Sequence, residues 1–275
     1  MMKKIQTNQG LDIMGDGHGC LTSRMNLIEQ AGYIQDINGL YWHPEGRKLV
    51  YLNDEANKGS LRDEDVIFGE FPSIAMTLMM VQHIKADLAY AVDSNNNVKL
   101  VSFLEHFEHQ RSNKMLFAKE FFKFQEKFGK QAALHLRNEL LPILKTLPSH
   151  LIVENDKGEE VAVIVHAGIK DEMIGKDSTE IRRFCAFGGK NTDMISWIYQ
   201  HRTPHLIIWG HLPHVHPTWK HNTVNIDTGG FCGHYLTMLR FPECTILQEK
   251  VPTDFSFKGH NTIKQLLARK KAISQ

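Results

Sequence analysis

Short apolar runs alternate with polar, glycine-containing loops in the first third of the chain. Residues 11–14 form one such run, and a Gly-Asp-Gly-His-Gly loop follows it. Leu21, Met25 and Ile28 then recur at helical spacing until Gly32, which is typical of a helix end. The same order, an apolar run followed by a polar loop and a helical segment, begins again at residue 48. The pattern therefore predicts strands over residues 11–14, 48–52 and 89–92, with helical segments between them.

A longer helical pattern interrupts this order. Phe117, Phe121, Phe124 and Phe128 are separated by four, three and four residues, the spacing of one helical face. We expect a helical insert over residues 103–150. Beyond it, turns separate β-prone runs at residues 161–165, 206–209, 223–226 and 235–241. Early strands alternate with helices and late strands are hairpin-like, so the predicted class is α/β, with mixed β-sheets flanked by helices.

The composition is that of an ordinary globular protein, with 42% hydrophobic and 23% charged residues. A chain of 275 residues can bury one large core, and we expect a single domain over residues 1–275. Its last segment, residues 258–275, is a basic tail in which Ile263, Leu266 and Leu267 share a helical face. We interpret this tail as a solvated helix or frayed end, or alternatively as a contact for a partner or nucleic acid.

Charge and cysteine usage limit the partners and the compartment. The 32 basic and 31 acidic residues give a net charge of +1, which offers no broad attraction to nucleic acid or to an anionic membrane. Any recognition of phosphate is therefore expected to be local. No apolar stretch reaches the roughly 18 residues of a membrane span, and residues 1–10 lack the apolar core of a signal peptide. The four cysteines form no C-x-x-C motif, so a reducing cytoplasm is expected.

Potential metal ligands follow the predicted strands. Loops at strand ends converge in open α/β sheets, and their carboxylate, amide and imidazole groups suit divalent cations. Taken singly, these residues have ordinary explanations: Asp16 and His18 can cap a helix and a turn, and His166 can be a hydrogen-bonded core histidine. His211 lies in a histidine-rich segment that is typical of a pH-sensitive or an adventitious metal-binding surface. The full set, which favours two metal ions, is Asp16, His18, Asp54, Asn95, His166 and His211.

Several motifs resemble those of calcineurin-like metallophosphoesterases in order and spacing. They are Gly15-Asp16-Gly17-His18-Gly19-Cys20, Val165-His166-Ala167-Gly168, Gly210-His211-Leu212-Pro213 and Asn225-Ile226-Asp227-Thr228-Gly229. Residues 43–48, 147–150 and 236–243 also resemble the bacterial PrpE-type branch of that family. This branch is related to diadenosine tetraphosphatases and to the phosphatase domain of bacterial polynucleotide kinase-phosphatases. The resemblance extends over most of the chain and implies a calcineurin-like metallophosphoesterase fold.

The resemblance implies a role for each candidate ligand. In the family's first loop, G-D-x-H-G, the aspartate and the histidine bind the first metal, which implies Asp16 and His18 here. The first aspartate of the second loop, G-D-x-x-D-R-G, bridges both metals and is retained as Asp54. The implied cofactors are two divalent ions, with manganese preferred to iron, zinc or nickel. The other implied ligands of the second metal are Asn95, His166 and His211.

Other positions depart from the family pattern. Asn57 and Lys58 replace the second aspartate and the arginine of the second loop, and Asn96 replaces the histidine of the third loop, G-N-H-D or G-N-H-E. That histidine, oriented by that aspartate, is implied to protonate the leaving group, so Asn57 and Asn96 are altered catalytic positions. The two amides can hydrogen-bond each other without carrying charge. Lys58 keeps a positive charge for substrate phosphate without the bidentate geometry of arginine, and a solvated loop lysine is the alternative.

The resemblance implies a phosphoesterase in which a metal-bridging hydroxide attacks phosphorus. General acid catalysis is worth about a hundred- to ten-thousandfold, so we expect weakened activity and a preference for leaving groups that need no proton. The expected substrates are a dinucleotide polyphosphate, an aryl phosphate, another phosphorylated small molecule or a phosphoprotein. The alternative is a pseudophosphatase that keeps its metals and acts as a binding or regulatory protein. Nucleic acid is a less favoured substrate, because the net charge of +1 predicts no basic path for a strand.

Overall fold

Two β-sheets stack face to face in the computed structural model, which describes residues 3–56, 70–109, 115–189 and 194–252. The strands of one sheet are β1 (Lys3–Gln6), β7 (His150–Glu154), β8 (Glu160–Val165), β9 (Leu206–Trp209), β10 (Thr218–Lys220) and β11 (Thr223–Asn225). Those of the other are β2 (Leu11–Met14), β5 (Lys48–Tyr51), β6 (Ala89–Ala91), β12 (Tyr235–Phe241) and β13 (Thr245–Lys250). The strand orders are β1-β7-β8-β9-β11-β10 and β13-β12-β2-β5-β6. Both sheets combine parallel and antiparallel pairs, so the predicted mixed sheets are confirmed.

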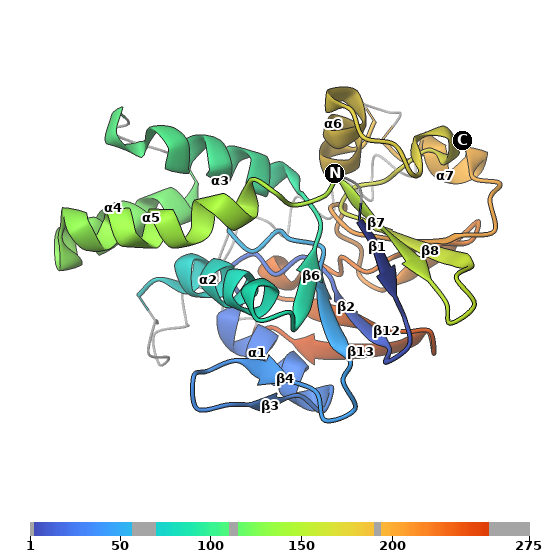
Figure 1. Ribbon diagram of the computed structural model, residues 1–275, viewed down its shortest axis with the longest axis horizontal. Helices are drawn as coiled ribbons and strands as arrows, with labels where there is room; N and C mark the ends of the chain where they lie inside the picture. The colour runs from blue at the N-terminus through green and yellow to red at the C-terminus, as the bar shows by residue number, and fades with distance from the viewer. Residues whose placement is uncertain (1–2, 57–69, 110–114, 190–193, 253–275) are drawn as a thin grey trace.

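Helices cover the outer face of each sheet (Figure 1). Those against the five-stranded sheet are α1 (Leu21–Gln30) and α2 (Pro72–Lys85), and those over the six-stranded sheet are α6 (Thr179–Phe187) and α7 (Ser196–Gln200). Three further helices, α3 (Asn95–His106), α4 (Leu116–Phe128) and α5 (Lys130–Leu144), pack against one another, and α4 and α5 also pack against α2. A short hairpin of β3 (Ile34–Gln35) and β4 (Tyr41–Trp42) lies apart from both sheets. None of the helices in the described ranges has the length and apolarity needed to cross a membrane. The predicted α/β class is confirmed.

Alternate residues of the strands fill the space between the two sheets. Leu11 and Ile13 of β2 point into this core, whereas Met14 packs against the helices on the other face, because successive side chains of a strand alternate between faces. In β5, Val50 lies between the sheets and Tyr51 faces the helices. Burying one such aliphatic side chain stabilises the fold by about 1.5–3 kcal/mol. The alternation therefore fixes the register that pairs Ile13 with Val50 and Met14 with Tyr51, so that β2 and β5 end side by side.

Each predicted strand lies within one residue of its observed bounds. Six strands within the described residues were not predicted, namely β1, β3, β4, β7, β10 and β13, and two of them bear on the six-stranded sheet's edge. In β1 only Ile5 is buried, between exposed Lys4 and Gln6, so no apolar run marks this edge strand. In β7 the run Leu151–Val153 is fully buried and is a strand signal that the prediction overlooked, because the segment follows directly on the helical pattern. β7 pairs with both β1 and β8, so its omission hid one edge of the six-stranded sheet.

Helix α4 carries the predicted row of phenylalanines. Phe117 and Phe121 are fully buried, whereas Phe128 is 53% exposed at the end of the helix. Gly129 alone separates α4 from α5, and the two helices pack against each other (Figure 1). The described residues of the segment 103–150 are thus largely helical, while its standing as an insert remains a prediction. The predicted basic tail, residues 258–275, lies outside the described residues.

Glu120 of α4 is predicted to make the fold less stable as the pH rises. Burial raises the pKa of this carboxyl group from 4.5 to about 7, although its Oε2 accepts the Ile74 N–H at the start of α2. The folded state therefore holds the proton more tightly than the unfolded state, and stability falls as the pH rises through about 7. Between pH 5.5 and pH 8 we expect a loss of about 2 kcal/mol relative to Glu120→Gln. Urea unfolding of both proteins at the two pH values measures it, and parallel pH profiles would contradict it.

Candidate metal centre

Loops at the carboxyl ends of several strands meet at one edge of the two sheets. β2, β5 and β6 are parallel neighbours in one sheet, and β8 and β9 are parallel neighbours in the other. Loops that follow parallel strands open toward the same edge. They carry the predicted ligands: Asp16 and His18 after β2, Asp54 after β5, Asn95 after β6, His166 after β8 and His211 after β9.

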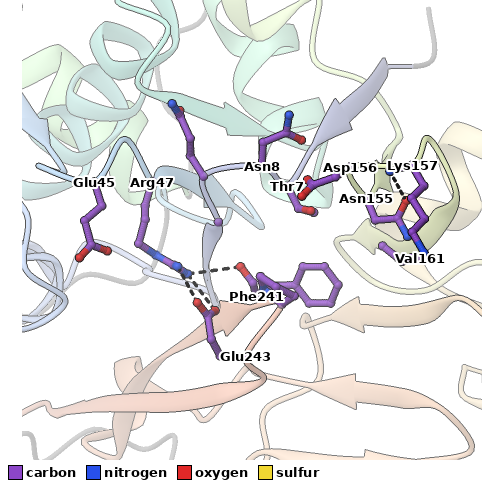
Figure 2. Close-up of a pocket in the computed structure, with 13 residues that line it drawn as sticks. Thr7, Asn8, Glu45, Arg47, Asn155, Asp156, Lys157, Val161, Phe241 and Glu243 are labelled. Carbon is purple, nitrogen blue, oxygen red and sulfur yellow. Dashed lines mark hydrogen bonds and ion pairs between the residues drawn. The ribbon is translucent and has the colours of Figure 1, made fainter.

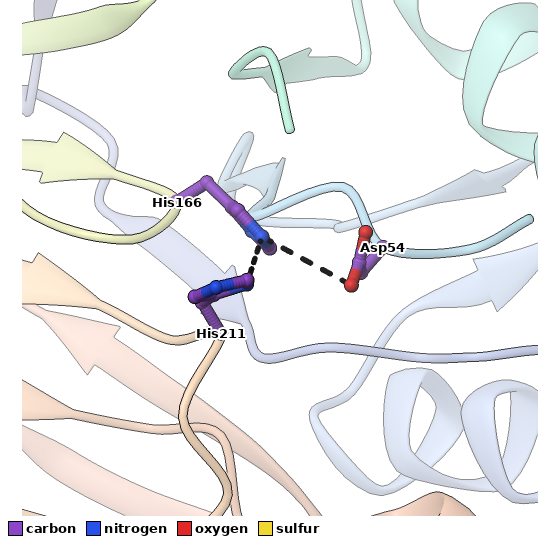
Figure 3. Close-up of side chains that lie close together, drawn as sticks. All are labelled: Asp54, His166 and His211. Atoms are coloured by element: carbon purple, nitrogen blue, oxygen red, sulfur yellow. Dashed lines mark hydrogen bonds and ion pairs between the residues drawn. The ribbon is translucent and has the colours of Figure 1, made fainter. Parts of the chain in front are cut away.

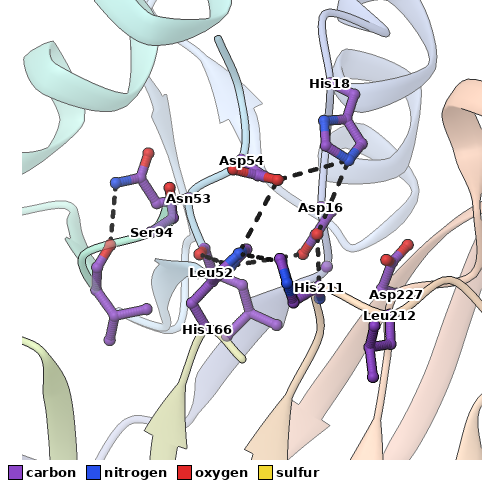
Figure 4. Close-up of polar contacts among 12 residues, drawn as sticks. Asp16, His18, Leu52, Asn53, Asp54, Ser94, His166, His211, Leu212 and Asp227 are labelled. Atoms are coloured by element: carbon purple, nitrogen blue, oxygen red, sulfur yellow. Dashed lines mark hydrogen bonds and ion pairs between the residues drawn. The ribbon is translucent and has the colours of Figure 1, made fainter. Parts of the chain in front are cut away.

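Asp16, His18 and Asp54 form a buried group (Figure 4). His18 Nε2 lies 3.6 Å from Asp54 Oδ2 and 3.9 Å from Asp16 Oδ2. One ligand atom from each of the three residues lies within 4.8 Å of the other two. The backbone N–H of His18 also donates to the carbonyl oxygen of Asp54, at 2.7 Å, which fastens the first loop to the second. The group has the spacing of side chains that surround a single cation.

Asp54 also belongs to a second group, with His166 and His211 (Figure 3). His166 Nε2 lies 3.9 Å from Asp54 Oδ2 and 3.1 Å from His211 Nδ1. The three ligand atoms again lie within 4.8 Å of one another. One carboxylate thus takes part in both groups, which is the arrangement required of a residue that bridges two cations.

The hydrogen bonds of His166 select the form of imidazole that binds metals. Its Nδ1 lies 3.0 Å from the carbonyl oxygen of Leu52, which can only accept, so Nδ1 carries the proton. Nε2 is then the lone-pair nitrogen, and it faces Asp54 and His211. Burial lowers the pKa of His166 to about 3. The side chain is therefore neutral near pH 7, as a metal ligand must be.

The charges and the unpaired oxygen atoms at this edge fit a divalent cation. Burial and the carboxylates of Asp227 and Asp54 raise the pKa of Asp16 well above its ordinary value. Buried carboxylates destabilise one another unless a positive charge offsets them. Asp16 Oδ1 and Asn95 Oδ1 are buried oxygen atoms that have no hydrogen-bond partner among the described residues. The described part of the chain therefore contains candidate metal-ligand groups of oxygen and imidazole donors.

The backbone of these loops adopts conformations that side chains disfavour. His18, Asn53 and His211 have φ angles of 49°, 62° and 70°, in the left-handed region. Residues in this region cost free energy, and such strain clusters at functional sites. Gly210 permits a close approach, because a Cβ atom there would lie 2.6 Å from Asp16 Oδ1. The strained positions thus coincide with the loops that present the candidate ligands.

Of the two altered catalytic positions, Asn96 lies within the described residues. Asn96 is 3% exposed, at the second position of α3, and its Oδ1 accepts a hydrogen bond from Lys99 Nζ at 3.3 Å. The Lys99 charge also contributes to the lowered pKa of His166, after burial, so this lysine adds positive charge near the second group of ligands. Asn57 and Lys58 lie outside the described residues. The hydrogen bond between Asn57 and Asn96 and the phosphate contact of Lys58 remain predictions.

Asp227 was not among the predicted ligands, although a motif on which the resemblance rests contains it. Its side chain is 1% exposed, and its Oδ1 accepts the Gly229 N–H at 3.0 Å. After burial, the charge of Asp227 is the largest cause of the raised pKa of Asp16. The motif was the available signal, because an aspartate directly after a buried strand has the same position as Asp16 and Asp54. Asp227 adds negative charge beside the first group of ligands.

Other histidines of the histidine-rich segment have partners away from this edge. His201 Nδ1 lies 2.5 Å from Asp171 Oδ1, and its Nε2 donates to the carbonyl oxygen of His205. His214 Nδ1 bonds Thr218 Oγ1 at 2.7 Å. A shared pH-sensitive surface therefore does not account for His211, whose ring lies against that of His166, with 5.0 Å between the centroids.

A cavity of about 750 Å³ lies at the other end of β2 (Figure 2). Residues 7–10, which precede this strand, form one wall, and none of the candidate metal ligands lines it. Arg47, which also lines it, already pairs with Asp12 and with Glu243, each at 2.9 Å. Two carboxylates of the protein thus already neutralise the guanidinium group. The candidate metal ligands lie at the opposite end of β2.

Several curated proteins are similar to this chain over most of its length, although no family model matches it. A bis(5'-nucleosyl)-tetraphosphatase PrpE of Anoxybacillus flavithermus is 30% identical over 242 residues, which cover 84% of this chain and 90% of that protein. A protein of the same name from Bacillus cereus strain AH187 is 29% identical over 258 residues, covering 90% and 95%.

Solved structures share the fold at lower sequence identity. A crystal structure described as that of a candidate diadenosine tetraphosphatase superposes with a TM-score of 0.61 at 16% identity, covering 92% of this chain and 99% of that chain. A cold-active protein-tyrosine phosphatase of a psychrophilic Shewanella superposes with a TM-score of 0.54 at 14% identity, covering 91% and 83%. These likenesses concern the fold alone, and they confirm the predicted α/β fold with mixed sheets flanked by helices.

Proposed function

Because this chain belongs to the family of PrpE-type bis(5'-nucleosyl)-tetraphosphatases, which are calcineurin-like metallophosphoesterases, we propose that it is a divalent-metal-dependent phosphoesterase. The observation that carries the proposal is the position of Asp54, whose carboxylate takes part in two groups of candidate ligands. The relatives, named as tetraphosphatases, support a hydrolase that cleaves a phosphoanhydride or a phosphate ester. A nucleotide-like polyphosphate is the proposed substrate class.

The residues would hold two cations. Asp16, His18 and Asp54 would hold the first, and Asp54 would share in the second. Bound ions of this kind polarise phosphoryl oxygens and lower the pKa of water. Manganese suits the mixture of oxygen and imidazole donors, with iron, zinc or nickel as alternatives. The other residues proposed to hold the second cation are Asn95, His166 and His211.

The chain's own residues restrict the leaving group. An amide at position 96 has no proton to give at neutral pH, and Asn57 adds no carboxylate to orient a donor. A phosphoanhydride or an aryl phosphate leaves as a stable anion, whereas an alkyl alkoxide needs a proton. We therefore propose a preference for dinucleotide polyphosphates or aryl phosphates, with Lys58 as a single-point contact for substrate phosphate.

Asn96 also supports a second function, a pseudophosphatase that keeps its metal ligands and binds a phosphorylated ligand without cleaving it. The relatives named as enzymes favour hydrolysis over this alternative. The two functions differ in turnover and agree in metal binding, so a measurement of both separates them.

The test is hydrolysis by the purified protein of diadenosine tetraphosphate and of an aryl phosphate, with and without Mn²⁺. We expect turnover of both substrates that EDTA abolishes and added Mn²⁺ restores. Bound Mn²⁺ is counted in parallel by calorimetric titration. Two equivalents of bound Mn²⁺ with no turnover of either substrate would refute hydrolysis and favour the pseudophosphatase.

A further inference from the structure

A buried ion pair lies directly beneath the candidate metal loops. Arg24 of α1 and Glu55 are 0% and 1% exposed. Arg24 Nη2 donates to Glu55 Oε1 at 2.9 Å and to the carbonyl oxygen of Gly15 at 2.7 Å. A fully buried pair of full charges is uncommon, because removing both ions from water costs several kcal/mol for each.

The pair joins the two loops that would supply the first cation. Gly15 directly precedes Asp16, and Glu55 directly follows Asp54. One guanidinium nitrogen therefore contacts the neighbour of each carboxylate ligand. Arg24 belongs to α1, so this contact also anchors both loops to a regular helix. Bonds of this kind, one residue away from a ligand, orient ligands in metal sites.

The loop between the ligands is shaped to admit the pair. A Cβ atom on Gly17 would lie 2.0 Å from Glu55 Oε2 and 2.4 Å from Arg24 Nη2. The φ angle of Gly17 is not in the positive region, so this position needs glycine for space and not for conformation. Gly17 and Glu55 also occupy places that the family's loop motifs leave open. The three residues therefore form one arrangement that the motifs do not require.

Stability alone explains the arrangement poorly. Arg24 Nε and Nη1 and Glu55 Oε2 are buried and have no hydrogen-bond partner among the described residues. A buried pair helps the fold only when its remaining polar atoms are also satisfied, and an apolar pair of similar volume is often at least as stable. Burial of the pair thus costs free energy of folding. What the pair contributes in return is its hydrogen bonding to both metal-ligand loops.

We propose that Arg24 and Glu55 are positioning residues that hold the loops of Asp16 and Asp54 at the spacing required for cation binding. The proposal rests on the proposed metal-dependent function. A purely structural pair would affect unfolding, whereas a positioning pair affects metal affinity even when stability is retained.

An apolar replacement separates these roles. Arg24→Met combined with Glu55→Leu removes both charges together, so the metal-free protein should melt within about 4 °C of the wild type. We expect its Mn²⁺ affinity, titrated by the paramagnetic resonance of free Mn²⁺, to fall by about 10- to 100-fold. Wild-type Mn²⁺ affinity in this double variant would overturn the proposal.

Gly17→Ala supplies a second test that keeps both charges and covers the case in which the double variant fails to fold. The added methyl group would displace the pair, so Mn²⁺ affinity should fall in the wild-type background. Wild-type Mn²⁺ affinity in a folded Gly17→Ala protein would overturn the proposal, and this outcome does not depend on the double variant.

Arg47→Met is the matched control. Arg47 pairs with Asp12 at 2.9 Å in a buried site at the far end of β2. Its loss should lower the melting temperature and leave Mn²⁺ affinity within about twofold of the wild type, since the metal loops are untouched. A fall in affinity equal to that of the apolar pair would indicate general loosening and overturn the proposal. Because the probe is Mn²⁺ alone, these titrations remain decisive even if no substrate is hydrolysed.

Discussion

Asp54→Asn is expected to reduce Mn²⁺-dependent hydrolysis by about a thousandfold or more, corresponding to roughly 4 kcal/mol of transition-state stabilisation. The size of the effect follows from the geometry, because this carboxylate lies 3.6 Å from His18 Nε2 and 3.9 Å from His166 Nε2 and so belongs to both groups of ligands. Replacement of one carboxylate oxygen by an amide weakens both proposed sites at once. Steady-state rates on diadenosine tetraphosphate, at several Mn²⁺ concentrations, measure the loss.

The substitution should leave the fold intact, which makes the activity interpretable. Asp54 is one of the charges that raise the pKa of Asp16, so removing it relieves repulsion between buried carboxylates in the metal-free protein. We therefore expect the metal-free variant to melt at or above the wild-type temperature, and to gain less stability than the wild type on addition of Mn²⁺. Residual activity above a tenth of the wild-type rate would mean that Asp54 does not bridge two functional cations.

The sequence predicted the residues of this edge because they follow a simple rule of chain order. Asp16 and Asp54 come directly after short apolar runs, and the parallel pairing of β2 with β5 brings such positions together. Chain order alone cannot say which carboxylate lies between the two groups, since that depends on how the second sheet stacks on the first. The resemblance supplied that assignment, which stays a prediction, and Asp54 Oδ2 lies 3.6 Å from His18 Nε2 and 3.9 Å from His166 Nε2.

The Arg24–Glu55 pair escaped prediction for a different reason. An arginine in an amphipathic helix is normally solvated, so the pattern of α1 was interpreted from its apolar residues alone. Yet Arg24 lies three residues after Leu21 and four before Ile28, which places it on the apolar face. That position was the available signal for a buried charge. Its partner could not be identified, because Glu55 is remote in sequence and resembles an ordinary loop residue.

The combined variant Asn57→Asp with Asn96→His is expected to accelerate alkyl phosphate hydrolysis by about a hundredfold and to change aryl phosphate hydrolysis by less than about threefold. The reason is that an imidazole at position 96 can protonate a poor leaving group, whereas a stable aryl anion gains little from a proton. The dependence of kcat/KM on the pKa of the leaving group, measured over a series of alkyl and aryl phosphates, should become less steep. Equal acceleration of both classes would contradict the assignment of position 96.

The single variant Asn96→His is the informative control, because the ammonium group of Lys99 already lies beside position 96. Lys99 Nζ lies 3.3 Å from Asn96 Oδ1 and its charge contributes to the lowered pKa of His166. The same charge would disfavour a protonated imidazole at position 96, and the carboxylate from Asn57→Asp would offset it. Above pH 7, the single variant should therefore show less than a tenth of the rate increase that the combined variant shows. Its share of that increase should grow as the pH falls, because the imidazole then becomes protonated. An equal gain without the aspartate would show that Lys99 does not control the proton at this position.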